Sequence, residues 1–194
     1  MIIPATTPRL SREALSERLA RAGHVIDRRV HPVIVVGIRG YYLDTMGNAG
    51  VNDRGIFDDA IFLDSPTATV AYNGNTDPSR VRVGTPALQG MAVLDPGLYY
   101  AHRFDLHKGE YLALCQRNGP VNVTRDGGKK ERGYFGINIH RAGETVTSSE
   151  GCQTVPFSQW SGFRSLAISE AKRYFGDEWK RRTIPYALLE EVRS

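Results

Sequence analysis

The sequence predicts a mainly β fold of the α+β class, with one helix near the N-terminus and one after residue 152. Short runs of β-branched and aromatic residues alternate with clusters of Gly, Pro, Asn and Asp. Hydrophobic residues make up 41% of the 194 residues and charged residues 24%, which are ordinary values for a globular protein. No repeat or break in composition divides the chain, so we expect one domain over residues 1–194, a sandwich or barrel.

The N-terminal residues predict a short extended arm, residues 1–8, followed by a helix. Ser11 is a typical N-cap, Leu10 and Leu15 are placed to form a hydrophobic staple, and Gly23 is typical of a helix end. The apolar face of this helix is expected to carry Leu15, Leu19 and Ala22. We expect the helix to pack on the edge of the domain and to have a structural role.

Runs of β-branched and aromatic residues separated by turn residues predict the strands. They lie at residues 30–42, 61–63, 67–72, 80–83, 98–104, 111–116, 134–140 and 183–189. Between the first two, residues 44–60 are rich in Gly, Asp and Asn and predict a loop long enough to be functional. Its Asp53, Asp58 and Asp59 do not have the spacing of an EF-hand.

A second helix is predicted after residue 156, with Ser158 as its cap and Gly176 as its end. Apolar residues recur there at helical spacing, namely Trp160, Phe163, Ala167, Ala171 and Tyr174. We interpret this stripe as core packing in preference to a ligand-binding face.

The net charge of +4 favours contact with polyanions, but its distribution argues against a nucleic-acid interface. The densest basic groups, at residues 129–132 and 180–182, lack the interleaved aromatic residues of a base-stacking surface. The longest apolar run, residues 33–36, is too short to cross a bilayer. Nucleic acid is therefore not an expected partner, and no transmembrane segment is expected.

Neither the cysteines nor the histidines predict a metal site, and no cofactor is expected. Two cysteines cannot form a disulfide framework for a domain of this size, and Cys115 lies in an apolar run typical of a buried strand. His102 and His107 are five residues apart, so on a strand they would point to opposite faces.

The segment from His140 to Cys152 holds the groups that nucleophilic attack on a carbonyl requires. A nearby imidazole can raise the thiolate fraction of a cysteine. Gly151 permits a tight turn that brings amide N–H groups to a developing oxyanion, while Ser148 and Ser149 can hydrogen-bond within the loop. The segment therefore predicts cysteine acyl-transfer chemistry. Buried structural roles for both residues are the alternative.

The sequence GYFGINIHRAGETVTSSEGCQTVP resembles the catalytic signature of the L,D-transpeptidase (YkuD-like) family, in which a strand ends in the catalytic His and a loop leads to Ser-His-Gly-Cys. Here the strand is residues 137–140 and the loop ends at residues 149–152. Upstream, LDPGLYYAHRF is similar to the family's Thr-Pro-x-Gly-x-Tyr/Phe segment. The likeness spans about residues 60–165 and extends to phage and prophage cell-wall proteins. It implies an L,D-transpeptidase-like β-sandwich or barrel and peptidoglycan as partner.

The sequence also departs from the family pattern. Arg141 stands where the family has Gly, Glu150 replaces the His before Gly-Cys, and Gln153 and Thr154 replace an aliphatic residue and Arg. The loop from His to Cys is shorter than the family's. Loss of the family's Arg favours wall hydrolysis, as by an endolysin, over cross-linking. Glu150 is expected either to orient His140 as a third catalytic member, to act as a general acid, or to be a solvated loop residue.

Three functions follow as hypotheses. In the first, Cys152 is the nucleophile, His140 the base, and the loop around Gly151 and Ser149 the oxyanion site of a peptidoglycan acyl-transfer enzyme. In the second, Glu150 serves a glycan-strand hydrolase on the same scaffold, with Glu144, Asp105 or Glu110 as the second carboxylate. In the third, the chain is an inactive wall-binding or virion module.

The N-terminal residues lack the basic-then-apolar order of a signal peptide. We therefore expect synthesis in the cytoplasm and action on the periplasmic cell wall only after delivery by a holin or a secretion system.

Overall fold

The computed structural model describes residues 3–191; the first two residues of the predicted arm lie outside this range. The helices are α1 (Arg12–Arg21), α2 (Phe157–Phe175) and the short 3-10 helix η1 (Gly176–Lys180). The strands are β1 (Ile34–Arg39), β2 (Asp59–Ser65), β3 (Ala68–Gly74), β4 (Ala92–Leu94), β5 (Gly97–His107), β6 (Tyr111–Gln116), β7 (Val121–Arg125), β8 (Lys130–Gly133), β9 (Ile139–Arg141), β10 (Gln153–Val155) and β11 (Ile184–Glu190). With 34% strand and 18% helix, the predicted mainly β class is confirmed.

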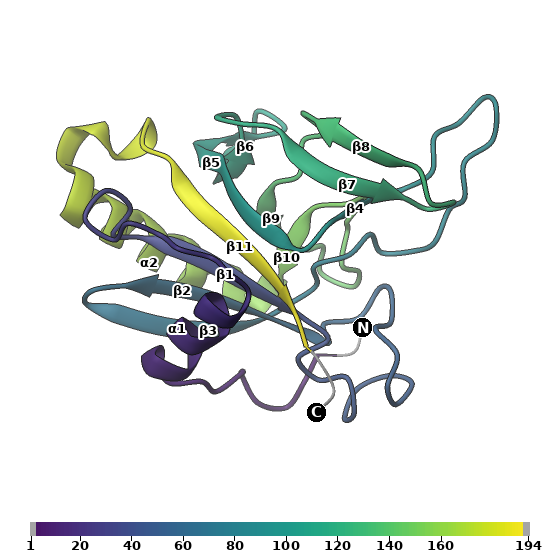
Figure 1. Ribbon diagram of the computed structural model, residues 1–194, viewed down its shortest axis with the longest axis horizontal. Coiled ribbons are helices and arrows are strands. Elements are labelled where there is room, and N and C mark those ends of the chain that lie inside the picture. The colour runs from purple at the N-terminus through teal and green to yellow at the C-terminus, as the bar shows by residue number, and fades with distance from the viewer. Residues whose placement is uncertain (1–2, 192–194) are drawn as a thin grey trace.

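Eight strands form one curved, nearly closed barrel-like sheet in the order β10-β9-β6-β5-β11-β1-β2-β3 (Figure 1). Its two edges approach each other at Asn75 and Thr154, which exchange N–H···O bonds of 2.9 and 2.8 Å. The last strand, β11, lies between β5 and β1, so the predicted return of residues 183–189 to the sheet is confirmed. A second sheet has the order β4-β7-β8.

The two long helices cover opposite faces of the strands β11, β1 and β2 (Figure 1). Leu15 and Leu19 of α1 pack on the residues at even positions of β1, such as Ile34 and Val36. The residues of α2 pack in the main core with the odd positions, Val33 and Val35. Side chains alternate between the two faces of a strand, and helices cover both faces of β1. Both faces are therefore buried, which explains why residues 34–38 are all non-polar.

The predicted helix ends are confirmed except for one cap. The Ser11 side chain accepts from the Ala14 N–H at 3.1 Å, and Gly23 follows α1 with φ +73°. Ala22 is exposed, so it does not share the buried face of Leu15 and Leu19. Ser158 is not the cap of α2, because the helix already begins after Pro156, which pre-sets the backbone there.

Two predicted strands are wrong in extent. Residues 80–83 form no strand; they belong to the long exposed loop between β3 and β4 at the right of Figure 1. Of residues 134–140 only the last two are in a strand, because the N–H groups of Phe135 and Ile137 donate to the side chain of Gln116 (3.0 and 3.1 Å) and not to a neighbouring strand. Strands β4, β7, β8 and β10 were not predicted, and the polar sequence of β8 explains its omission.

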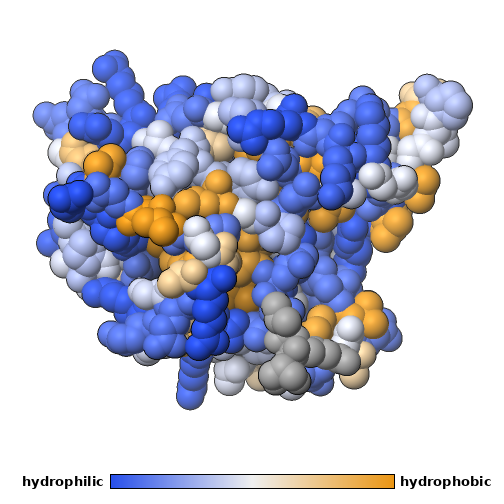
Figure 2. Space-filling model, viewed as in Figure 1, coloured by the Kyte–Doolittle hydropathy of each residue, from blue (hydrophilic) through white to orange (hydrophobic). Residues whose placement is uncertain are grey.

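The surface is mostly hydrophilic, with two apolar features on the face seen in Figure 2. Apolar side chains gather in the middle of this face, and others lie on the projecting β3–β4 loop, where Val81 and Val83 are exposed. Within residues 3–191, no helix combines the length and the apolar character that crossing a bilayer requires.

Candidate functional site

Strands β9 and β10 bring His140 and Cys152 to one face of the large sheet. The two strands pair in parallel, with Thr154 beside His140, and Cys152 directly precedes β10. Residues two apart on a strand point to the same face. The shared face therefore carries Asn138, His140, Cys152 and Thr154. The sequence predicted only that a loop separates His140 from Cys152. The parallel pairing of β9 with β10 is what brings the two segments side by side.

His140 is held as a neutral imidazole of one tautomer. Its Nδ1 lies 2.7 Å from the carbonyl oxygen of Arg141, which can only accept, so Nδ1 carries the hydrogen and Nε2 keeps its lone pair. The side chain is 4% exposed and stacks on His107 with 4.1 Å between ring centroids. Burial, together with the neighbouring His107, lowers the pKa of His140 to about 4. At neutral pH the ring is therefore uncharged, and its Nε2 can accept a proton.

Cys152 carries a protonated thiol. Its half-buried Sγ donates to the Gly136 carbonyl at 3.2 Å and accepts from the Asn138 N–H at 3.4 Å. Burial raises the pKa of the thiol to about 11, an effect that the Asn138 N–H only partly offsets. The sequence predicted that a nearby imidazole would raise the thiolate fraction of Cys152, but the structure shows no such effect. Within residues 3–191 no hydrogen bond joins Sγ to His140, and the His140 ring is itself uncharged.

The turn before Cys152 is fixed by hydrogen bonds and close packing. Ser149 Oγ donates to the Cys152 carbonyl at 2.7 Å and accepts from the Gly151 N–H at 3.0 Å. Gly151 has φ +144°, and a Cβ there would overlap the Ala92 carbonyl oxygen of β4. The N–H groups of Ser149 and Gly151 are already paired, whereas those of Glu150 and Cys152 make no hydrogen bond in the described part of the chain. We take the Cys152 N–H, on the same residue as the sulfur, as the candidate donor to an oxyanion.

Ser79 and Gln153 hold the same turn against the rest of the barrel. Ser79 accepts from the Ser149 N–H and donates its own N–H to the Ser149 carbonyl, both at 2.8 Å. Gln153 donates to the carbonyls of Thr76 and Gly151 at 3.3 and 3.2 Å and accepts from the Tyr186 hydroxyl at 2.7 Å. Ser79 and Tyr186 are distant from Cys152 in the sequence, so no local sequence pattern predicted their contacts with this segment.

His107 is the site residue that the sequence did not identify as one. Besides stacking on His140, its Nδ1 accepts from the Asn138 side-chain amide at 3.1 Å. The prediction that His102 and His107 face opposite sides of one strand is confirmed: His102 is fully buried, bonds the Ile137 carbonyl at 2.8 Å and has no contact with His140. The alternation of β5 was the signal that would have placed His107 on the site face.

Glu150 does not orient His140. Its side chain is 79% exposed and its carboxylate lies 3.7 Å from the guanidinium of Arg82, whereas His140 is oriented by a backbone carbonyl. Of the candidate partner carboxylates, Asp105 pairs with Arg117 at 2.8 Å. The same residues contain no group of three acidic, His or Cys side chains suited to a metal ion.

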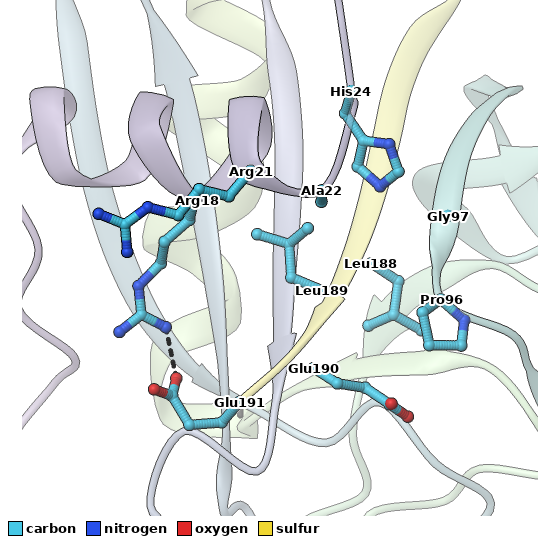
Figure 3. A pocket seen from close by; sticks show the side chains of 10 residues that line it. All are labelled: Arg18, Arg21, Ala22, His24, Pro96, Gly97, Leu188, Leu189, Glu190 and Glu191. Carbon is cyan, nitrogen blue, oxygen red and sulfur yellow. Dashed lines mark hydrogen bonds and ion pairs between the residues drawn. The ribbon is translucent and has the colours of Figure 1, made fainter. Parts of the chain in front are cut away.

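A cavity of about 520 Å³ lies elsewhere. It is bounded by α1, the end of β11 and the turn before β5 (Figure 3). Leu188, Leu189 and Pro96 form its apolar wall, and Arg18 bonds Glu191 at its rim. Neither Cys152 nor His140 lines it, so the proposed chemistry does not occur in this cavity.

Comparison of the chain with family models, curated proteins and solved structures finds no significant match.

Proposed function

We propose that the chain is a cysteine-dependent acyl-transfer enzyme that acts on peptidoglycan stem peptides, with an L,D-transpeptidase (YkuD-like) fold. The observation that carries the proposal is the parallel pairing of β9 and β10, which sets Thr154, two residues after Cys152, beside His140, with His140 Nδ1 bonded to the Arg141 carbonyl. That bond leaves Nε2 free to accept a proton, as a general base requires. The peptidoglycan substrate rests on the sequence resemblance.

The reaction begins with transfer of the thiol proton to His140 Nε2. The thiol hydrogen must first turn away from the Gly136 carbonyl, a side-chain rotation on the picosecond to nanosecond scale. The sulfur then attacks the carbonyl carbon of a stem-peptide amide, and the oxyanion accepts from the Cys152 N–H. One such donor is worth about 3 kcal/mol in the transition state. His140 returns the proton to the leaving amine, which leaves a thioester on Cys152.

Water resolves the thioester in a hydrolase, and an amine resolves it in a cross-linking enzyme. We propose hydrolysis, because Thr154 stands where the related family has its Arg and its side chain is buried. An endolysin-like role in wall degradation, with delivery by a holin or secretion system, is the form that this proposal takes. The glycan-hydrolase alternative has less support, since the Glu150 side chain is exposed and lies 3.7 Å from the guanidinium of Arg82, which favours its ionised form over a general acid.

A second candidate function, an inactive wall-binding or virion module, is favoured by one observation. Cys152 bonds backbone groups and not His140, and burial raises its pKa to about 11. In such a module the thiol has only a packing role. Turnover separates the two candidates.

Digestion of purified peptidoglycan tests the proposal. The acyl-transfer enzyme is expected to release new amino groups and shortened or separated stem peptides, identified by mass spectrometry of the muropeptides. New reducing sugar ends that disappear in Glu150→Gln would instead support the glycan hydrolase. Binding to wall material without any product would support the inactive module.

The pH profile is expected to report the buried state of His140. Because the base must be unprotonated and its pKa is lowered to about 4, kcat/KM is expected to fall on the acid side near pH 4 and to stay level from pH 6 to 8. An acid limb at pH 6.5 or above would contradict the assignment.

Folding must be followed at each pH by circular dichroism. The folded pKa of His140 lies below its unfolded value near 6.5, so the unfolded state binds the proton more readily. Stability linked to His140 is therefore complete above pH 6.5 and is lost as the pH falls toward 4. Loss of activity at a pH where the fold persists is the informative result.

A further inference from the structure

Arg141 is an exposed arginine held in place by two aromatic rings. It follows His140 in β9, and its guanidinium carbon lies 5.1 Å from the centroid of the Tyr111 ring and 4.8 Å from that of Phe157. Stacking on aromatic faces leaves the N–H edges of a guanidinium directed outward, where they can bind a planar anion in bidentate fashion. Phe157 itself is 42% exposed, so this stack lies at the surface.

The guanidinium of Arg141 has no acidic partner within residues 3–191. Several arginines of the chain do have one: Arg39 pairs with Asp77, Arg54 with Asp126, and Arg125 with Glu131. A positioned cation without a counterion is suited to an anion that arrives from outside.

A continuous row of rings connects this cation to the proposed base. The Tyr111 ring lies 5.6 Å from that of His107, which stacks on His140 at 4.1 Å. Lys108, in the turn after β5, is exposed and interacts electrostatically with His107, His140 and Cys152. Within the described residues it also forms no salt bridge. The surroundings of the thiol and imidazole are therefore cationic on the side of β5, β6 and β9.

We propose that Arg141 binds a carboxylate of the stem peptide and so determines which peptides the site accepts. This inference rests on the proposed function and extends it from the reacting groups to substrate recognition. Arg141 directly follows His140 in β9, so its side chain leaves the strand on the other face, and the rings of Tyr111 and His107 lead from it to His140. A free carboxylate would form paired hydrogen bonds with the guanidinium, and the peptide would extend past these rings to place the scissile amide over Cys152 and His140. An amidated peptide has no negative charge to offer and would lose these bonds.

The test compares two probes, L-alanyl-γ-D-glutamyl-L-lysyl-D-alanine and the same peptide with both carboxylates amidated. The kcat/KM of the wild-type protein is expected to be about tenfold or more higher for the peptide with free carboxylates than for the amidated peptide. A preference of this size corresponds to the usual free energy of hydrogen bonds to a charged group. In Arg141→Gln this ratio is expected to fall to about one, through KM. The matched control, Arg181→Gln, removes another exposed arginine and is expected to keep the wild-type ratio.

A second variant and a binding measurement make every result decisive. Phe157→Leu keeps Arg141 but removes one ring of its stack, and is expected to lower the ratio less than Arg141→Gln does. Affinity of the Cys152→Ala protein for both peptides, measured by calorimetry, is expected to show the same preference. A wild-type ratio near one, or a ratio unchanged in Arg141→Gln, overturns the inference even if Cys152-dependent turnover occurs. Preferential, Arg141-dependent binding without turnover supports the inference and refutes the proposed function. Absence of both binding and turnover overturns both.

Discussion

Replacement of Cys152 by Ala is expected to abolish turnover of stem peptides while the protein stays folded. The substitution removes the atom that forms the thioester, so the loss in kcat should reach the detection limit of the assay. The folded state loses only the Sγ contacts with Gly136 and Asn138, which are worth about 1 to 2 kcal/mol. Activity is measured by release of amino groups from peptidoglycan, and stability by thermal unfolding.

Cys115→Ala is the matched control for this experiment. Cys115 is fully buried in β6 and free, as the sequence predicted, and its thiol contacts the Asp105 carbonyl at 3.6 Å. Its removal is expected to cost stability by a small cavity and to leave activity in place. A Cys152→Ala protein with wild-type turnover would exclude Cys152 as the nucleophile and leave the inactive module or the glycan hydrolase to be considered.

Replacement of Arg39 by Met is expected to destabilise the fold strongly. Arg39 is buried in β1, lies 3.3 Å from Asp77, and donates to the Thr76 carbonyl at 2.9 Å and to the Leu94 carbonyl at 3.0 Å. Removing one member of a buried ion pair leaves an uncompensated charge, which costs about 3 to 5 kcal/mol. Urea unfolding measures the loss. Arg182→Met, at an exposed position, is the control and is expected to change stability by less than about 0.5 kcal/mol.

The loss in Arg39→Met is expected to be larger at pH 8 than at pH 5. Burial raises the pKa of Asp58 to about 8 and that of Asp59 to about 6, while Arg39 opposes the rise at Asp59. A carboxyl group whose folded pKa is raised holds its proton better in the folded state, so stability falls as the pH rises from the unfolded value near 4 through 6 and 8. The methionine in Arg39→Met would carry no positive charge to offset the negative charge that Asp58 and Asp59 acquire as the pH rises. Equal losses at both pH values would contradict this account.

The sequence predicted those elements whose signals are local. The boundaries of β6 match the predicted residues 111–116, and Ser11 and Gly23 mark the ends of α1, because apolar runs and capping residues act through near neighbours. The failures are non-local. The Gln116 side chain takes the N–H groups that would have made residues 134–138 a strand, and the polar β8 exists only through its pairing with β7.

The same division applies to the candidate site. The types and spacing of His140 and Cys152 were enough to select them, since acyl transfer needs a thiol and a base. Their protonation was not predictable, because the Gly136 carbonyl, the stacked His107 and the extent of burial are set by tertiary packing. Glu150 was selected because it precedes Gly151 in the sequence, yet its side chain forms an ion pair with Arg82.

The closure of the barrel between Asn75 and Thr154 has a consequence for the proposed nucleophile. The residue that completes this seam lies two positions after Cys152, and Ser79, four positions after Asn75, binds the turn before it. Partial opening of the seam would therefore loosen the turn before Cys152, while the partners of its sulfur, Gly136 and Asn138, lie in the segment before β9 and stay in place. The rate at which thiol-modifying reagents react with Cys152 would then measure local opening between Asn75 and Thr154 while the rest of the fold stays intact.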